Sequence, residues 1–338
     1  MGDAVEQVMN LIFGRWRSQI LYAGAELGIF DHIQSDRWIS PTELADTLRL
    51  APDLLYRLMR AQAALGLLIE DHKRCFMLSA TGALLRDDAK PSLKHMARLA
   101  EGPQHYAIWS HLPDVVRDGK QDAFEREFGY GAFEHARRDA DYASRFRMGM
   151  SSYSEVQSAL AIAVLRQRAP SSISTFCDIG GGHGHLTCSV LREFPHMSGV
   201  VFDLPDVIAD RGEPWAERLG VEGRCSYVGG DMFTAVPKAD AYSLKMILHD
   251  WSDSDCVRIL SNVRKAAKVG ARLYIIEHIV PGPDAAHLSK LFDIHMMVWG
   301  KGRERSQTEY NDLLRLAGWT PGEISYPSNG LIGVLEAT

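Results

Sequence analysis

The second half of the chain alternates between short β-prone runs and segments in which apolar residues recur at helical spacing. The runs span residues 174–178, 199–203, 225–228, 241–248 and 272–277. Helical segments are expected at 186–194, at 252–268 and after the capping box that Ser306 can form with Glu309. Strands that alternate with helices form a parallel sheet covered on both faces. The pattern therefore predicts an α/β fold with a doubly wound, mostly parallel sheet.

The first 80 residues follow a different pattern. Residues 4–33 carry apolar positions at helical spacing. A short helix is expected at 42–48, a longer one between Pro52 and Gly66, and a hairpin at 67–78. This order of elements predicts a mainly α-helical winged-helix domain. The apolar stripe of residues 4–33 needs a cover, which could be another helix of this chain or a second subunit.

Winged helices often bind DNA through their second helix, which lies in the major groove. Here that helix, at 52–66, has only Arg57 and Arg60 as cations and is otherwise mostly apolar. We expect it to be buried, which favours a scaffold or dimer role. The formal net charge of −6 also gives no general excess of positive charge for nucleic acid or acidic membranes. We therefore expect neither as a partner.

Length and cysteine content narrow the class further. A chain of 338 residues fits two domains better than one. Its five cysteines are scattered without a Cys-x-x-Cys pair, so neither a disulfide framework nor a zinc site is indicated. No basic leader followed by an apolar stretch opens the sequence, and no window approaches the roughly 20 apolar residues of a membrane span. A cytoplasmic location is the simplest expectation.

A glycine-rich turn follows the first run of the predicted sheet. It reads Asp178-Ile179-Gly180-Gly181-Gly182-His183-Gly184-His185. Glycines there allow a ligand to approach the backbone closely. His185 stands where a dinucleotide fingerprint has its last glycine or alanine, which favours a nucleoside with an amino-acid tail over a pyrophosphate.

Acidic residues follow the next two predicted strands. Asp203, at the end of the second strand, can accept hydrogen bonds from both hydroxyls of a ribose. After the third strand come Asp231, suited to an adenine amino group, and the apolar Met232 and Phe233, suited to its faces. Together with the glycine turn, these residues predict an adenosine site. The alternative is that the acids are helix caps or turn residues.

The fourth predicted strand leads into Lys245-Met246-Ile247-Leu248-His249, and catalytic groups of open α/β sheets collect beyond the carboxyl ends of strands. Glu277 ends the fifth strand, so it could accept a hydrogen bond from one imidazole nitrogen of His249 and leave the other as a general base. Taken alone, one histidine among 13 is more often structural. The position of His249 makes it the candidate base.

These segments resemble the dimeric small-molecule O-methyltransferases, which include plant caffeate and flavonoid enzymes, hydroxyindole O-methyltransferase and bacterial antibiotic-tailoring enzymes. Among the bacterial members, the phenazine O-methyltransferases are the most similar. The resemblance covers nearly the whole chain and rests on Glu26-Leu27-Gly28-Ile29-Phe30, Phe146-Arg147-Met148-Gly149-Met150-Ser151, the glycine turn, Phe202-Asp203-Leu204-Pro205, Gly229-Gly230-Asp231-Met232-Phe233, Leu248-His249-Asp250-Trp251-Ser252 and Gly302-Arg303-Glu304-Arg305.

The resemblance implies a homodimer and methyl transfer from S-adenosylmethionine to an aromatic hydroxyl, without a metal. It implies a winged-helix dimerisation domain at 1–100, a helical connector at 101–169 that contributes to the substrate pocket, and a cofactor-binding methyltransferase domain at 170–338. Its implied catalytic residues are His249 as the base, with Glu277 and Glu304 beside it. Its implied cofactor residues lie at the strand ends: Asp178, Gly180, Gly182, Asp203, Asp231, Met232, Phe233 and Lys245.

The implied substrate pocket differs from that of the plant enzymes. Those enzymes read Asn-Pro-Gly-Gly-Lys-Glu where this chain reads Trp299-Gly300-Lys301-Gly302-Arg303-Glu304, so Trp299 replaces a polar pocket residue. With Met150, His295 and Met296 as further walls, the pocket suits a flat and rather large aromatic molecule. The same side chains could also be ordinary core.

Two other functions remain open at the level of the residues. A winged helix could belong to a transcription regulator that binds DNA. A doubly wound sheet with a glycine turn could belong to a nicotinamide-dependent oxidoreductase, although His185 departs from its fingerprint.

Overall fold

The computed structural model describes residues 2–209, 215–327 and 330–338. They form two compact units, which we call the first and the second unit. The first unit comprises Met1–Ala107 and Phe133–Tyr153, and the second comprises Ile108–Ala132 and Ser154–Thr338. Residues 101–169, expected to form one connector, are divided between both units. The boundaries at 100 and 169 therefore stay predictions.

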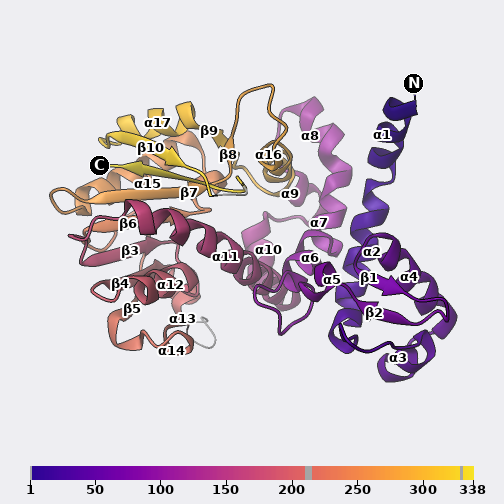
Figure 1. The fold of residues 1–338 in the computed structure, drawn as a ribbon. Helices are drawn as coiled ribbons and strands as arrows, with labels where there is room; N and C mark the ends of the chain where they lie inside the picture. The colour runs from indigo at the N-terminus through magenta and orange to yellow at the C-terminus, as the bar shows by residue number, and fades with distance from the viewer. Residues whose placement is uncertain (1, 210–214, 328–329) are drawn as a thin grey trace. The chain divides into compact units, whose positions relative to one another are not determined.

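The second unit is built on a seven-stranded sheet with the order β10-β11-β7-β6-β3-β4-β5 (Figure 1). Strands β3 to β7 run parallel to one another, whereas β11 pairs antiparallel with both β7 and β10. The fold class predicted from the sequence is confirmed. The strands are β3 (Thr175–Ile179), β4 (Ser198–Asp203), β5 (Cys225–Gly229), β6 (Ala241–Lys245), β7 (Arg272–Glu277), β10 (Pro321–Ser325) and β11 (Gly333–Ala337).

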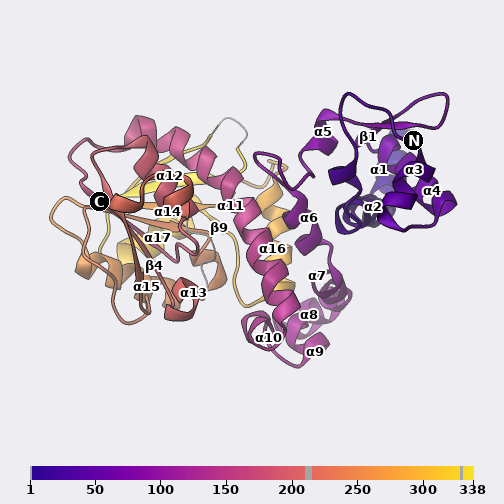
Figure 2. The same cartoon turned by 90° about the horizontal axis from the view of Figure 1, so that it is seen from below.

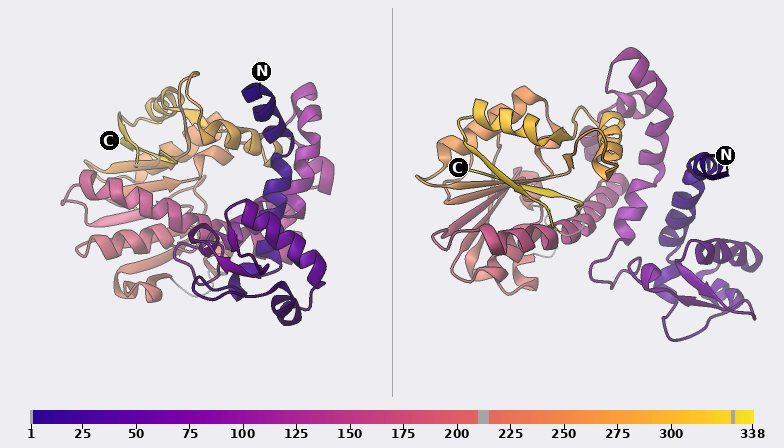
Figure 3. Two further views of the ribbon diagram at one scale, coloured as in Figure 1. Left: turned by 45° about the vertical axis from the view of Figure 1, so that its right-hand side comes forward. Right: turned by 45° about the horizontal axis from the view of Figure 1, so that its top comes forward.

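Helices cover both faces of this sheet, because side chains of successive strand residues point to opposite faces. Leu273 and Ile275 of β7 pack with α15 (Asp253–Ala266) and α17 (Gln307–Leu316). Tyr274 and Ile276 pack on the other face, where the core includes residues of three further helices. These are α11 (Ala140–Arg168), α12 (His185–Glu193) and α14 (Trp215–Arg218). Figure 2 shows α12 and α14 from that side, and the right panel of Figure 3 shows the three layers.

One predicted strand is too long. The run 241–248 was expected to be extended throughout, but β6 ends at Lys245. Met246 has a positive φ of 55°, which no β-strand accommodates, and Leu248–Asp250 form the short 3₁₀ helix η4. The expected capping box is confirmed, since the Ser306 hydroxyl accepts from the Glu309 N–H and the Glu309 side chain accepts from the Ser306 N–H.

A second, smaller sheet lies beyond the end of β7. It consists of β8 (Ile279–Val280) and β9 (Arg305–Ser306), which pair in parallel. Helix α16 (Leu288–Trp299) runs between them in sequence. The second unit also contains α13 (Pro205–Ala209), the 3₁₀ helices η2 (Trp109–His111) and η3 (Glu222–Arg224), α8 (Leu112–Asp118) and α9 (Ala123–Phe128).

The first unit contains the expected helices and hairpin. Helix α3 (Pro41–Leu48) packs on α4 (Pro52–Ala64), and β1 (Leu68–Glu70) pairs with β2 (Phe76–Leu78) (Figure 1). Helix α4 buries only one face, through Leu55, Met59 and Gln62. The expectation that this helix is buried was therefore half wrong. The remaining elements include α5 (Ala80–Ala83), α6 (Lys94–Ala100), α7 (Pro103–Ile108, which ends at the unit boundary) and α10 (Ala132–Arg138).

The N-terminal apolar stripe is divided among three elements: α1 (Gly2–Ile12), α2 (Gly14–Glu26) and the 3₁₀ helix η1 (Ile29–His32). Its second half is core, since Ile29 and Phe30 are fully buried. In its first half the described side chains are largely exposed, Val5 by 62%, Ile12 by 61% and Trp16 by 62%. Among the described residues, no helix has both the length and the apolar composition to cross a membrane.

Candidate active site

The glycine turn joins β3 to α12 at the carboxyl edge of the sheet. Gly180 and Gly182 have positive φ values of 69° and 55°, which other residues rarely adopt. A Cβ on Gly180 would lie 2.3 Å from Cδ1 of Ile247, so the turn packs directly against the residues that lead to His249. A Cβ on Gly182 would meet no atom within 4 Å. The turn is therefore tightly packed at Gly180 and open at Gly182.

Asp203, at the end of β4, holds this turn from the side. Its Oδ2 accepts a hydrogen bond from the Gly182 N–H at 2.8 Å, and its Oδ1 accepts from the Leu204 N–H at 2.7 Å. Burial raises the pKa of the carboxyl, and these two donors oppose the rise. Each oxygen keeps a lone pair for a ligand, so the turn-residue role and the predicted ribose role are compatible.

Asp178 lies under the turn, at the end of β3. Its carboxylate is buried and accepts from the Ser243 hydroxyl at 2.6 Å and from the Thr187 hydroxyl at 3.3 Å. Burial raises its pKa to about 6. Lys245, at the end of β6, is one of the charges that oppose this rise, while burial lowers the pKa of the lysine itself. The cofactor roles predicted for both residues stay predictions.

The residues after β5 make mainly local contacts. Asp231 is exposed and accepts from the Phe233 N–H at 2.9 Å and the Thr234 hydroxyl at 3.3 Å, as a turn residue does. Met232 and Phe233 are half-buried against the core of the α15 face. The ring of Phe233 also meets Trp251 edge to face at 4.7 Å. An adenine contact by these three residues stays a prediction.

His249 lies on η4, directly after β6, and its side chain is buried. Its Nδ1 is 2.8 Å from Oε1 of Glu304 but 3.8 Å from Oε2 of Glu277. The sequence predicted Glu277 as the hydrogen-bond partner, and this was wrong because its Oε2, at 3.8 Å, is too far from Nδ1 for a hydrogen bond, while its Oε1 is bound to the backbone. Its Oε1 accepts from the N–H groups of Ile247 at 3.0 Å and Leu248 at 2.9 Å.

The pairing of β8 with β9 explains how the two glutamates meet. Ile279 lies opposite Arg305 in this pair. Glu277 precedes Ile279 by two residues and Glu304 immediately precedes Arg305, so both carboxylates come to the same end of the small sheet. Glu304 became a candidate only through the family resemblance, because a two-residue strand leaves no hydrophobic pattern in the sequence.

Acidic groups surround the imidazole of His249. Burial opposes its positive charge, but Glu277, Asp250 and Glu304 outweigh burial and raise the pKa of His249 to about 10. Burial also raises the pKa of Glu277 to about 7 and of Asp250 to about 6. Asp250 was missed by the sequence analysis, yet its Oδ1 lies 3.6 Å from Nε2, the nitrogen that Glu304 leaves available. Its place next to His249 in the chain was the available signal.

Aromatic side chains of α16 lie close to His249. Phe292 stacks nearly parallel to the His249 ring with centroids 6.2 Å apart, and His295 stacks with Trp109 at 6.1 Å. Phe292, His295, Met296 and Trp299 share one helix face by their spacing. Met296 and Trp299 are almost fully buried. Phe292 was missed, although its position three residues before His295 could have indicated it.

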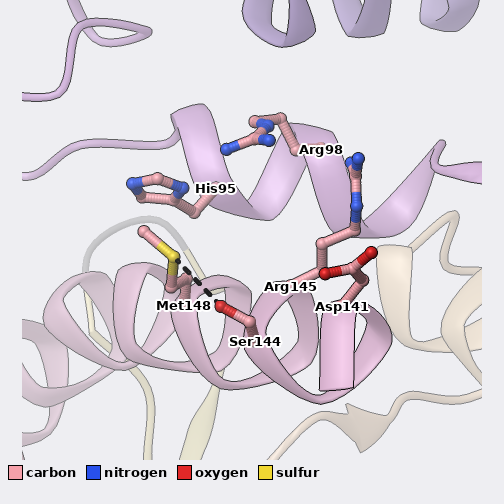
Figure 4. A pocket seen from close by; sticks show the side chains of 6 residues that line it. All are labelled: His95, Arg98, Asp141, Ser144, Arg145 and Met148. Carbon is pink, nitrogen blue, oxygen red and sulfur yellow. Dashed lines mark hydrogen bonds between the residues drawn. The ribbon is translucent and has the colours of Figure 1, made fainter. Parts of the chain in front are cut away.

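Met150 belongs to the first unit, on α11, and is 37% exposed. Its predicted contact with substrate stays a prediction. The first unit also contains a cavity of about 330 Å³ between α6 and α11, lined by His95, Arg98, Asp141, Ser144, Arg145 and Met148 (Figure 4). The two arginines there are bound to Glu26, and His95 is bound to Asp87. Their charges are thus largely compensated within the protein.

Comparisons with known proteins identify the two parts of the chain. Residues 109–320 match the O-methyltransferase domain family, and residues 9–87 match the O-methyltransferase dimerisation domain. The phenazine O-methyltransferase PhzM of Lysobacter antibioticus is 32% identical over 331 residues, covering 98% of this chain and 95% of that protein.

Two solved structures are similar over almost their whole length. The crystal structure of LaPhzM has a TM-score of 0.90 and 31% identity, covering 99% of this chain and 98% of that one. CalO1, a methyltransferase of calicheamicin biosynthesis solved with S-adenosylhomocysteine (SAH) bound, has a TM-score of 0.85 and 28% identity with the same coverage. The chain thus belongs to the O-methyltransferase family whose members combine this catalytic domain with a dimerisation domain.

Proposed function

We propose that this enzyme transfers a methyl group from S-adenosylmethionine to a hydroxyl of a planar aromatic molecule, with His249 as the general base. The observation that carries the proposal is the hydrogen bond of 2.8 Å between Nδ1 of His249 and Glu304, beside the glycine turn. It fixes the tautomer in which Nδ1 carries the proton, so the free base form has its lone pair on Nε2.

The residues of the turn fit the proposed cofactor. Gly182 has open space where a side chain would point, and Asp203 is half-buried beside it with unused lone pairs. Glycines with positive φ followed by a helix are the arrangement that binds nucleoside cofactors in doubly wound folds. S-adenosylmethionine, when bound, supplies a methyl group already activated by its sulfonium. The chain itself must then bind, orient and deprotonate the acceptor.

Deprotonation is the task of His249. A phenol has a pKa near 10, and the carboxylates around His249 raise its pKa to about 10. The proton can therefore pass from the hydroxyl to Nε2 with little energetic cost. Glu304 stabilises the imidazolium that forms, and Glu277 holds the backbone on which the ring is mounted. Because the base is an imidazole, the proposed reaction needs no metal ion.

The substrate class follows from the surroundings of the base. Phe292, His295 and Trp109 present flat rings, and burial lowers the pKa of His295 to about 4, so this imidazole stays neutral. Neutral aromatic walls favour a flat aromatic acceptor. A phenazine, the substrate named for the Lysobacter relative, is the class we propose first. We also propose that Met296 and Trp299 contribute to this pocket, and that the protein is a homodimer through its N-terminal domain.

Two measurements test the proposal. Calorimetry with SAH should show binding, and absence of binding at millimolar concentration would remove the cofactor assignment. Turnover should then be measured by mass spectrometry on a panel of hydroxylated aromatics, phenazines included. His249→Gln should lower kcat by about two to four orders of magnitude with SAH affinity nearly unchanged. His72→Gln, in the exposed hairpin turn, is the matched control. Near-normal turnover of His249→Gln would place the base elsewhere.

A further inference from the structure

The backbone around His249 is held by a short segment from a distant part of the sequence. We call residues 247–251 the His249 turn and residues 302–305 the clamp. The N–H of Arg303 donates to the His249 carbonyl at 2.8 Å. Gly302 packs so closely that an added Cβ would lie 1.7 Å from the same oxygen. The clamp therefore contacts the His249 turn through its own backbone as well as through Glu304.

Arg305 supplies the strongest contacts of the clamp. Its Nη1 donates to the Leu248 carbonyl at 2.8 Å, and its Nη2 donates to the Trp251 carbonyl at 2.8 Å. The Asp253 carboxylate accepts from Nε at 3.0 Å and from Nη2 at 2.8 Å. Arg305 thus binds carbonyls on both sides of His249 with one rigid, planar group.

The burial of Arg305 indicates a purpose other than stability. Its side chain is only 1% exposed, whereas its partner Asp253 is 56% exposed. Taking a guanidinium out of water is energetically costly, and apolar side chains of similar volume often stabilise a protein as well or better. What an apolar side chain cannot do is fix two carbonyl oxygens in one plane. The geometry of Arg305 is therefore better explained by the precision that it imposes on the His249 turn.

The opposite end of the turn has a matching contact. Glu277 accepts from the N–H groups of Ile247 and Leu248, so a buried anion holds the amides while a buried cation holds the carbonyls. Leu248 is held on both sides. Between these two ions the backbone of His249 has little freedom, and Glu304, the neighbour of Arg305, fixes the rotation of the ring.

We propose that Arg305 is a positioning residue of the enzyme: it sets where the His249 imidazole lies through the Leu248 and Trp251 carbonyls. This inference rests on the proposed function, in which His249 is the base. A misplacement of about 1 Å in a catalytic group can cost on the order of 100-fold in rate. Arg305, the second arginine of the Gly302-Arg303-Glu304-Arg305 motif, thereby affects the rate through the position of His249 and not through contact with the substrate.

The test uses Arg305→Lys in the full-length protein. Lysine keeps the positive charge but lacks the planar fork, so the electrostatic field at His249 changes little while the two carbonyls lose their common anchor. We expect kcat to fall about 10- to 100-fold, with KM and SAH affinity within about threefold of wild type. If the lysine variant does not fold, Arg305→Met replaces it, because a buried apolar side chain removes the cost of an unpaired charge.

A second readout does not depend on methyl transfer. Histidine labelled with ¹³C at Cε1 reports the titration of His249 by NMR, and its signal is identified by its absence in His249→Gln. In Arg305→Lys the pKa of His249 should fall by about one unit, because the ring loses its alignment with Glu304. Even if the wild-type protein proved not to be a methyltransferase, the His249 titration in Arg305→Lys would still test whether Arg305 positions the imidazole.

The matched control is Arg224→Met. Arg224 also donates to two backbone carbonyls at 2.8 Å, those of Met197 and Leu191, but these lie in the loop before β4 and near the end of α12. It should lower stability while leaving the His249 titration and kcat unchanged. Equal loss of kcat in both arginine variants, or an unchanged His249 signal and turnover in the Arg305 variant, would overturn the proposal.

Discussion

Replacing Glu304 by glutamine should shift the pH dependence of the reaction in a defined way. The glutamine oxygen can still accept the Nδ1–H hydrogen bond of 2.8 Å, so the ring keeps its orientation, but the negative charge is lost. A hydrogen bond to a charged acceptor is worth about 1 to 2 kcal/mol more than a neutral one. Since 1.36 kcal/mol corresponds to one pKa unit, the pKa of His249 should fall by about one unit from its value of about 10.

The sign of the effect follows from the role of Nε2. His249 accepts a proton only when Nε2 is unprotonated, so log(kcat/KM) of the wild type should rise with pH from neutral toward a pKa well above the usual 6.5. In Glu304→Gln the rise of log(kcat/KM) should end about one pH unit earlier, because His249 with its lower pKa is unprotonated at lower pH. The plateau of log(kcat/KM) should also be lower, because a weaker base accepts the proton of the substrate less readily. The two profiles should therefore converge near pH 7 and separate in alkaline buffer.

The assay is initial-rate formation of SAH between pH 6 and 10.5 at constant ionic strength. Glu304→Ala serves as the comparison, because it removes both the charge and the hydrogen bond and should be slow throughout the range. A wild-type acid limb near pH 6.5 would refute the reasoning about the carboxylates. A limb at the same pH in wild type and Glu304→Gln would refute the assignment of Glu304 as the partner of His249.

Three further variants test separate parts of the structure. Gly302→Ala places a Cβ 1.7 Å from the His249 carbonyl, so we expect a loss of about 1 to 3 kcal/mol in urea unfolding together with a strong loss of turnover; normal values for both would contradict the close approach. Asp203→Ala removes the acceptor for the Gly182 N–H, and calorimetry should show SAH affinity at least about tenfold weaker, whereas unchanged affinity would remove the ribose assignment. The hydrogen bond from Arg145, opposed by burial and supported by Arg98, lowers the pKa of Glu26 to about 2. The ionised Glu26 therefore contributes at most about 3 kcal/mol to the free energy of unfolding. This contribution is present above pH 4.5 and is lost as the pH falls toward 2. Thermal midpoints of wild type and Glu26→Gln should differ at pH 6 and converge near pH 2; a constant difference would contradict this sign.

Strands β3, β6 and β7 were predictable because they are buried on both faces of the sheet and rich in apolar residues. Strands β10 and β11 were not predicted. The run 272–277 matches β7 at both ends. The run 241–248 was too long because its last residues stay apolar while the backbone turns at Met246, and side-chain pattern carries no information on φ. The single helical stripe at 4–33 failed for the same reason, since apolar spacing continues across the break after Ile12.

The active site was predictable only in part. His249 and Glu277 follow strands of the sheet, and strand ends meet at one edge. Glu304 depends on the two-residue pair β8–β9, which leaves no signal in the local sequence. Phe292 lies three residues before His295 on α16, and that spacing was the available signal. The carboxylate of Glu277 illustrates the limit of such reasoning. The sequence places it near His249, but only the structure shows that it binds backbone amides and leaves the imidazole to Glu304.

The uncovered half of the N-terminal stripe has a consequence for handling the protein. Val5, Ile12 and Trp16 face water in the single chain, so burying them against a second copy would stabilise the folded state by mass action. The melting temperature should then rise with protein concentration, and strong dilution should lower stability.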